Sequence, residues 1–172
     1  MAVLNLLDPD RMAMIAKGVS AIVASCSADM RPSIMRAIGT HVSSDGQQLT
    51  VYLRRSQSAC VLNDIADNGQ LAVVFSEPAT HRTLQLKGHA LNVRPATLND
   101  APLLAAYRAS MEIEVGRVGF GPVYVAAMLA GPIEDVVAVA FQPTQAFDQT
   151  PGPKAGEALP PIGGTTTGAA RA

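Results

Sequence analysis

The 172-residue chain contains no tryptophan, and its three tyrosines and four phenylalanines amount to only 4% of the residues. Charged residues are also few, at 16%, whereas 48% of the residues are hydrophobic. A chain of this length can bury well over half of the surface that it exposes when unfolded. The scarcity of aromatic residues therefore predicts a core built mainly from Ala, Val, Leu, Ile and Met.

The sequence has no excess of either charge, because 13 basic residues face 14 acidic ones. This balance does not supply the positive field that non-specific nucleic-acid binding needs. No run approaches the roughly 20 apolar residues of a membrane span, and no basic region precedes the first apolar residues, as a secretion signal requires. We therefore expect a cytoplasmic globular protein that binds neither nucleic acid nor a membrane.

Metal-binding and catalytic patterns are equally sparse. Cys26 and Cys60 make a poor disulfide framework and match no zinc spacing. The three histidines, His41, His81 and His89, have no carboxylate or cysteine at ligand spacing. The sequence also contains no nucleophile elbow, no zinc-protease motif and no phosphate-binding glycine loop. We expect no metal site, and the catalytic residues remain unassigned.

Six segments have the alternation or the short apolar runs that are typical of β-strands. They lie at 20–27, 33–43, 49–54, 71–75, 83–93 and 136–142. Tight turns join the first three segments, and the second of these turns carries the Asp45-Gly46 hairpin signal. These three strands are therefore expected to be antiparallel.

Apolar residues at helical spacing predict helices at about 9–17, 59–68 and 100–116, with a shorter one near 126–129. Because strands do not alternate regularly with helices, a doubly wound sheet is not expected. The predicted fold is mainly β, a small antiparallel barrel of six strands with outer helices. After Thr150 the sequence becomes rich in Pro, Gly, Thr and Ala, so we divide the chain into a domain over 1–150 and a tail over 151–172.

The most informative stretch is Tyr52-Leu53-Arg54-Arg55-Ser56-Gln57-Ser58, where a predicted strand ends and a predicted helix begins. The free N–H groups and the dipole at a helix N-terminus favour an anion. The planar guanidinium of arginine fits a phosphate. These residues suit a phosphate monoester held at a strand-to-helix junction. The alternative is a capped helix beside two solvated arginines.

Two further polar positions interrupt the predicted sheet. Arg36 shares its face of the second strand with Ile34 and Ile38, and an arginine on an apolar face needs an anionic partner, either a carboxylate or a ligand. Gln85 and Lys87 lie on the polar face of the fifth strand. That face either meets water or lines a groove.

These motifs follow one another in a recognisable order. The series Y-L-R-R-S-Q-S, I-A-D-N-G, L-A-V-V-F-S-E-P and T-L-Q-L-K-G-H-A resembles the pyridoxamine-phosphate-oxidase-like family of flavin-binding split barrels. The resemblance covers about 19–93, the closing strand, and the segment F-D-Q-T-P-G-P-K-A-G at 147–156. The ordered series carries it, since no single motif is diagnostic.

The resemblance implies a homodimeric split barrel of six strands with FMN bound in two clefts at the dimer interface. It places the FMN phosphate at the end of the third strand, by Arg54, Ser56, Gln57 and Ser58, with Arg55 as the second basic residue. It places the isoalloxazine ring along the second strand, by Met35, Arg36, Ala37 and Ile38. It brings Gln85 and Lys87 close to the ring or the phosphate.

The expected function is that of an FMN-binding protein and flavin-dependent oxidoreductase acting on a small molecule, because the cofactor carries the hydride chemistry in such proteins. Vitamin B6 oxidation is not expected, since PGPKAG replaces the arginine-rich end of the true oxidases. Relatives of this architecture also use a deazaflavin or haem. The alternatives are therefore a haem-binding or haem-handling barrel, with His81 or His89 at the iron, and a non-catalytic dimer with a vestigial cleft.

The composition also bears on the cofactor site. With no tryptophan, a tight aromatic sandwich around the flavin ring is not expected, and Tyr52 and Tyr124 are the aromatic candidates. A barrel closed by aliphatic side chains leaves apolar surface that one subunit cannot cover, which favours a dimer.

Overall fold

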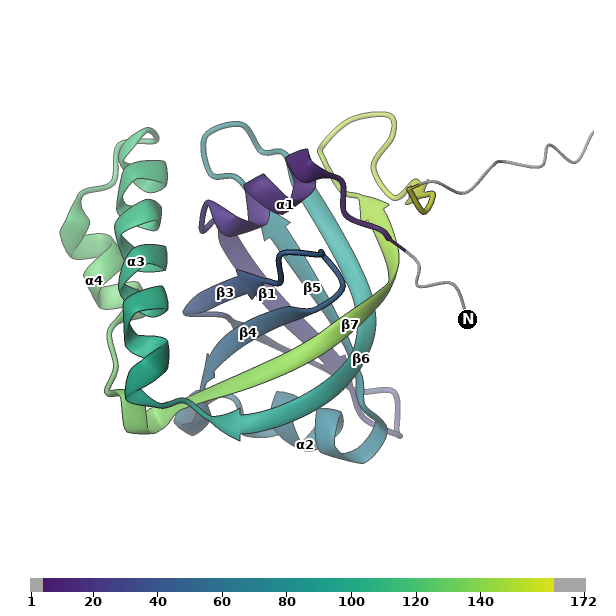
Figure 1. The fold of residues 1–172 in the computed structure, drawn as a ribbon, viewed down its shortest axis with the longest axis horizontal. Coiled ribbons are helices and arrows are strands. Elements are labelled where there is room, and N and C mark those ends of the chain that lie inside the picture. The colour runs from purple at the N-terminus through teal and green to yellow at the C-terminus, as the bar shows by residue number, and fades with distance from the viewer. Residues whose placement is uncertain (1–4, 163–172) are drawn as a thin grey trace, which may run out of the picture.

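Residues 5–162, which the computed structural model describes, form one antiparallel sheet and four helices (Figure 1). The strands are β1 (Ser20–Cys26), β2 (Pro32–Arg36), β3 (Gly39–Val42), β4 (Leu49–Arg54), β5 (Gln70–Ser76), β6 (Thr83–Pro95), β7 (Val136–Asp148) and β8 (Ala158–Leu159). The helices are α1 (Pro9–Ala16), α2 (Ala59–Asn68), α3 (Ala101–Gly116) and α4 (Pro122–Leu129). The strand order is β2-β1-β5-β6-β7-β4-β3, and β8 pairs with β7.

The two end strands of this order follow each other in the chain, with only Ala37 and Ile38 between them. The N–H of Ala37 donates to the carbonyl of Ala21 at 2.9 Å, whereas the N–H of Ile38 donates to the carbonyl of Tyr52 at 2.8 Å. The two end strands are therefore joined through the chain without pairing to each other, and this curled, open sheet confirms the predicted split barrel. The single strand predicted over 33–43 is divided into β2 and β3 because the chain changes its partner at this point.

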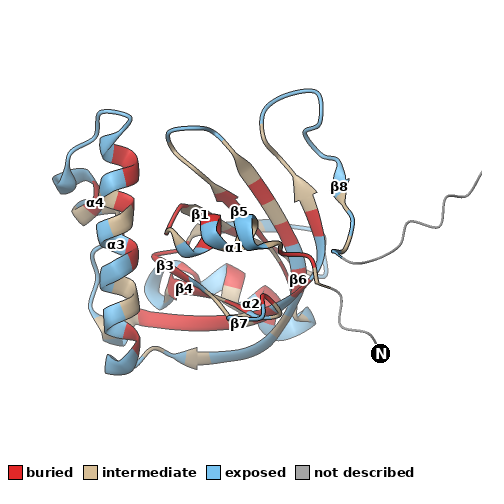
Figure 2. Ribbon diagram, turned by 45° about the horizontal axis from the view of Figure 1, so that its top comes forward, coloured by how far each residue is buried: buried red, intermediate tan, exposed pale blue. Residues whose placement is uncertain are grey.

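The barrel core is aliphatic, as the composition predicts. Buried residues alternate with less buried ones along β1, β5 and β6 (Figure 2), so one face of each strand points into the barrel. Val23, Val73 and Val139 are completely buried there. Phe75 and Phe141 are the largest completely buried side chains among residues 5–162.

A second apolar cluster lies outside the barrel, where α3 and α4 pack side by side against the barrel wall (Figure 1). Ile38 and Tyr52 reach this cluster from the wall, and Met111 reaches it from α3. The hydroxyl of Tyr107 donates to the carbonyl of Val19 at 2.6 Å, which ties the middle of α3 to the barrel. The connection between β6 and β7 thus carries a helical hairpin that covers one side of the barrel.

The helices begin where their capping residues predict. Asp8 caps α1 by accepting a hydrogen bond from the N–H of Arg11 at 2.7 Å. Thr97 and Asp100 form a capping box ahead of α3. The short fourth helix of the prediction is α4, which starts earlier than expected. None of the helices between residues 5 and 162 has the length and apolar content that a membrane crossing requires.

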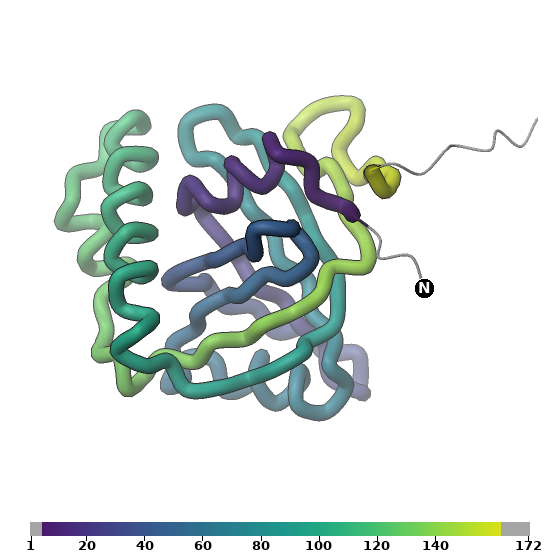
Figure 3. The backbone as a smooth tube through the Cα atoms, viewed as in Figure 1, coloured from purple at the N-terminus to yellow at the C-terminus, as the bar shows by residue number. Residues whose placement is uncertain are grey.

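The segment expected to be a tail, 151–172, folds back onto the barrel in its described part. Figure 3 shows this part looping back beside the end of β7. Leu159 of β8 pairs with Ala146 of β7, and its side chain packs against the barrel core. Residues 163–172 of the expected tail lie outside the described residues.

Gly88 lies where β6 and β7 approach each other closely and their pairing shifts register. A Cβ atom at this position would lie 2.1 Å from the carbonyl oxygen of Gln142 and 2.8 Å from its carbonyl carbon. Both atoms belong to the backbone of the neighbouring strand, so they cannot rotate away. Any side chain in place of the glycine of the Leu-Lys-Gly element would therefore clash with the backbone of β7.

We expect Gly88→Ala to lower the free energy of unfolding by about 3 kcal/mol, because the added methyl group forces two paired strands apart. Gly116→Ala is the matched control. Nothing lies within 4 Å of a Cβ at Gly116, so this change in α3 is expected to be neutral or slightly stabilising. Urea denaturation of both variants measures the difference, and equal midpoints for the two would contradict the steric explanation.

Candidate functional site

The predicted cofactor-binding residues fall in three places on the molecule. The first is the junction of β4 and α2, which holds Arg54, Arg55, Ser56, Gln57 and Ser58. The second is the wall formed by β2 and the start of β3, with Met35, Arg36, Ala37 and Ile38. The third is the outer face of β6, with Gln85 and Lys87. Tyr52 belongs to none of these three.

At the β4–α2 junction, a carboxylate from elsewhere in the chain already occupies the donors of Ser56. The backbone N–H of Ser56 donates to Oδ1 of Asp135 at 2.9 Å, and the Ser56 hydroxyl donates to Oδ2 at 2.6 Å. These bonds, together with the charges of Arg54 and Arg55, hold the pKa of Asp135 below its usual range. The junction therefore holds one of the chain's own carboxylates, and phosphate binding at this strand-to-helix turn stays a prediction.

Arg54 connects the same junction to α4. Its Nη2 donates to the carbonyl oxygen of Met128 at 2.8 Å, where a cation is favourable because the last carbonyls of a helix lack partners. Gly131 packs so closely that a Cβ there would lie 3.3 Å from Nε of Arg54. That Nε and the hydroxyl of Ser58 are both buried and have no hydrogen-bond partner in the described part of the chain.

Arg36 faces a cavity of about 290 Å³ between the barrel wall and the α3–α4 hairpin, which we call the Arg36 cavity. Its Nη1 donates to the hydroxyl of Ser20 at 2.8 Å. No carboxylate between residues 5 and 162 forms an ion pair with it. The helical wall of the cavity is apolar or aromatic, with Met111, Val115, Val118, Phe120, Tyr124 and Met128.

The Arg36 cavity and the β4–α2 junction adjoin along α4. Met128 lines the cavity, and its carbonyl accepts the hydrogen bond from Arg54. On the cavity side, the rings of Phe120 and Tyr124 stack with their centroids 4.7 Å apart. The region around α4 thus brings together Arg36, which has no carboxylate partner among residues 5–162, the stacked rings of the cavity wall, and the turn where Ser56 binds Asp135.

The other residues predicted on the second strand lie elsewhere. Met35 packs against the barrel core and Ala37 is completely buried in it. Ile38 lies outside with Arg36, as the shared face predicted, but it borders a different cavity of about 340 Å³ between α3 and the segment that joins α4 to β7. Of these four residues, Arg36 is the one that lines the Arg36 cavity.

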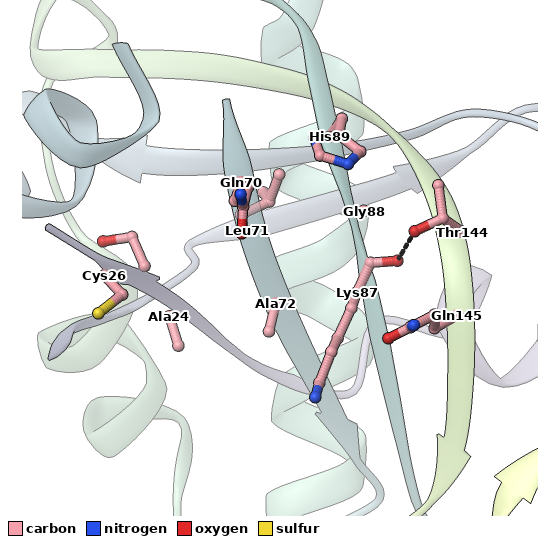
Figure 4. A pocket seen from close by; sticks show the side chains of 11 residues that line it. Ala24, Cys26, Gln70, Leu71, Ala72, Lys87, Gly88, His89, Thr144 and Gln145 are labelled. Atoms are coloured by element: carbon pink, nitrogen blue, oxygen red, sulfur yellow. Dashed lines mark hydrogen bonds between the residues drawn. The ribbon is translucent and has the colours of Figure 1, made fainter. Parts of the chain in front are cut away.

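Gln85 and Lys87 contact residues at the end of β7 and just after it. The Oε1 atom of Gln85 accepts a hydrogen bond from Nε2 of Gln149 at 3.2 Å, and Nζ of Lys87 lies 4.8 Å from the ring centroid of Phe147. Lys87 also lines a cavity of about 400 Å³ on the outer face of β1, β5, β6 and β7 (Figure 4). This cavity shares no lining residue with the Arg36 cavity. Gln85 nevertheless faces the same side of the sheet as Arg36, because Arg36, Ile22, Val74 and Gln85 form one cross-strand row.

Tyr52 ties the barrel to the start of α3. Its hydroxyl donates to Oδ1 of Asp100 at 2.9 Å, and both oxygens of Asp100 accept from Arg94 at 2.8 Å. Burial and the carboxylate raise the pKa of Tyr52 to about 12, and the Arg94 guanidinium holds the pKa of Asp100 well below its usual range. In this structure the Tyr52 side chain is buried and offers no surface to a ligand.

Sequence reasoning missed Asp135 and Met128, the two residues that link α4 and its C-terminal connection to the junction. Asp135 lies 79 positions after Ser56, in a short 3-10 turn with no periodic pattern. Met128 takes part through a backbone carbonyl, which leaves no mark in a sequence. A signal did exist in α4 itself, because this helix is apolar on nearly every side.

No family model matches the chain, and no curated protein matches it. Solved structures do. A proposed pyridoxamine 5'-phosphate oxidase from Lactobacillus delbrueckii is 14% identical, with a TM-score of 0.54 over 83% of this chain and 94% of that one. An F420 reductase is also 14% identical, with a TM-score of 0.53 over 81% of this chain and 98% of that one.

The haem storage protein HutZ from Vibrio cholerae is 16% identical, with a TM-score of 0.50 over 84% of this chain and 95% of that one. The chain has the split-barrel fold of these proteins. At such low identity the likeness concerns the fold alone, and the names of the three proteins point to different ligands. A choice between these ligands therefore has to be argued from the residues of the site.

We expect Tyr52→Phe to lower the free energy of unfolding at pH 7 by about 1 kcal/mol, the usual contribution of one buried hydrogen bond. Because the pKa of Tyr52 is raised in the folded state, its protonated hydroxyl stabilises the protein fully below pH 10. This stabilisation is lost as the pH rises toward 12. The stability gap between wild type and variant should therefore narrow between pH 10 and pH 12. Urea denaturation at several pH values tests this, with the exposed Tyr124→Phe as control, for which a constant small difference is expected.

Proposed function

We propose that this chain binds FMN and works as a flavin-dependent oxidoreductase on a small molecule. The observation that carries the proposal is the anion held at the β4–α2 junction, where both donors of Ser56 grip a carboxylate. A phosphate monoester offers the same kind of oxygen acceptors. The fold shared with a proposed pyridoxamine 5'-phosphate oxidase supports the same assignment.

The donors at the junction fit the FMN phosphate. The buried Ser58 hydroxyl and the buried Nε of Arg54 have no partner between residues 5 and 162, and each would gain one from a phosphate oxygen. Buried polar atoms are rarely left without a partner unless a ligand or water completes them. Arg55 and Gln57, which are exposed, would add charge and a hydrogen bond at the rim.

The Arg36 cavity suits the flavin ring. Arg36, Ser20 and Ser76 would donate to the polar edge of the ring, and the apolar helical wall with Tyr124 would cover its face. Met35, Ala37 and Ile38 would support the barrel wall behind Arg36. The bound cofactor supplies the hydride chemistry, whereas the chain supplies the anchor, the orientation and the exclusion of water.

We also propose a homodimer with the cofactor at the interface, in which Gln85 and Lys87 would approach the cofactor from the sheet face that they share with Arg36. Large apolar side chains on the surface favour such a partner, since Ile34 is 68% exposed and Val123 is 82% exposed. We also propose a cytoplasmic location, on the composition alone.

A haem-binding function is the second candidate, favoured by one observation. His81 lines the Arg36 cavity and is exposed, so its imidazole is available to a haem iron. Haem storage is the role named for HutZ, which shares the fold. A deazaflavin would fit the same residues as FMN, so the ligand has to be identified chemically.

We expect the purified protein to be yellow and to release FMN on heating. Arg36→Met should weaken FMN binding by about 10- to 150-fold, because charge-assisted hydrogen bonds contribute about 1.5–3 kcal/mol. Arg31→Met, in the exposed turn before β2, removes the same charge and should change the affinity less than twofold. Fluorescence titration of FMN measures both.

Two results would contradict the FMN assignment. One is protein that copurifies with no flavin and takes up none when it is added. The other is a saturable Soret band on addition of haemin that His81→Ala abolishes, which would establish the haem alternative instead.

A further inference from the structure

Asp135 stands in the proposed phosphate position although it belongs to a different part of the chain. It lies at the end of the α4–β7 connection, residues 130–135, and both of its carboxylate oxygens accept from Ser56, at 2.9 Å and 2.6 Å. A phosphate oxygen pair would use the same N–H and the same hydroxyl. The carboxylate and a phosphate therefore compete for one set of donors.

The end of α4 and the α4–β7 connection together cover the β4–α2 junction. We call this segment, residues 128–135, the cover. Arg54 donates to the carbonyl of Met128 on one side of Gly131, and Ser56 donates to Asp135 on the other. Nε of Arg54 lies beneath this cover without a partner. A ligand that reaches that atom must first displace the cover.

The cover has room to move. Its inner side borders the cavity of about 340 Å³ lined by Leu129, Ala130, Gly131 and Ile133, so a shift of the connection need not repack the barrel core. Its outer side holds Ser56, which is exposed, and bonds at exposed positions contribute little to stability. Opening the cover therefore costs little compared with the bonds that a phosphate would make.

We propose that Asp135 is a built-in competitor for the phosphate monoester, so that it sets the preference of this site between phosphorylated and unphosphorylated flavin. The inference rests on the proposed FMN site at the β4–α2 junction. In the ligand-free protein the carboxylate holds the donors of Ser56 and keeps the connection closed. When a phosphate binds, it takes the donors of Ser56, and the carboxylate moves into solvent.

The test compares three ligands on three proteins. FMN, riboflavin and inorganic phosphate are titrated by calorimetry into the wild type, Asp135→Asn and Glu134→Gln. Glu134 is the matched control, because it is exposed, carries the same charge one residue away and makes no side-chain hydrogen bond or ion pair between residues 5 and 162. Thermal unfolding checks that each variant is folded, and Asp135→Ala replaces the Asn variant if that protein is unfolded.

We expect Asp135→Asn to bind FMN about tenfold more tightly than the wild type, and to bind riboflavin with an affinity within twofold of it. Glu134→Gln should bind both ligands within about twofold of the wild type. Equal gains for the two variants would overturn the inference, because they would reflect net charge alone. Unchanged FMN affinity in Asp135→Asn would also overturn it, while FMN binding itself would stand.

Inorganic phosphate separates this inference from the proposed function. If no protein binds FMN or riboflavin, but phosphate binds Asp135→Asn more tightly than the wild type and Glu134→Gln, then the flavin assignment fails and the role of Asp135 holds. If phosphate and both flavins bind none of the three proteins, the competitor role fails together with the FMN site.

Discussion

The architecture depends on a pair of adjacent backbone N–H groups that bond to opposite ends of the strand order. Ala37 bonds back to β1, and Ile38 bonds forward to β4. Because successive residues of a strand face opposite sides, this change of partner places Ala37 in the barrel core and leaves Arg36 and Ile38 outside. Inward-facing and outward-facing residues continue to alternate from β2 through Ala37 and Ile38. Arg36 therefore faces the outer wall, where its cavity lies.

The helical cover of this outer wall comes from one connection, whereas Pro78 and His81 line the cavity from the β5–β6 turn. The chain leaves β6 and returns to the neighbouring β7 only after it has built α3 and α4 (Figure 1). That connection supplies the apolar wall of the cavity, the carbonyl that holds Arg54, and the carboxylate of Asp135. The Arg36 cavity and the β4–α2 junction therefore both depend on this one connection.

Alternation and turn signals were enough to predict the barrel, because burial on a curled sheet is periodic and the Asp45-Gly46 turn is local. The outward position of Arg36 was also predicted from the sequence, because Arg36 shares its face of the strand with Ile34 and Ile38. The division of β2 from β3 was not predicted, because a change of hydrogen-bond partner leaves the side-chain pattern unbroken. Asp135 was missed for a related reason, since its partner Ser56 is brought near by the tertiary fold alone.

A near-neutral chain that gathers two arginines at a helix N-terminus has to stabilise them when no ligand is bound. Here the fold places its own carboxylate at the junction, where it accepts from Ser56 and where the charges of Arg54 and Arg55 lower its pKa. Under the proposed function, binding of a phosphate at this junction would exchange one anion for another. Its affinity follows the difference between the two anions, so a count of the available donors overstates how tightly such a site binds.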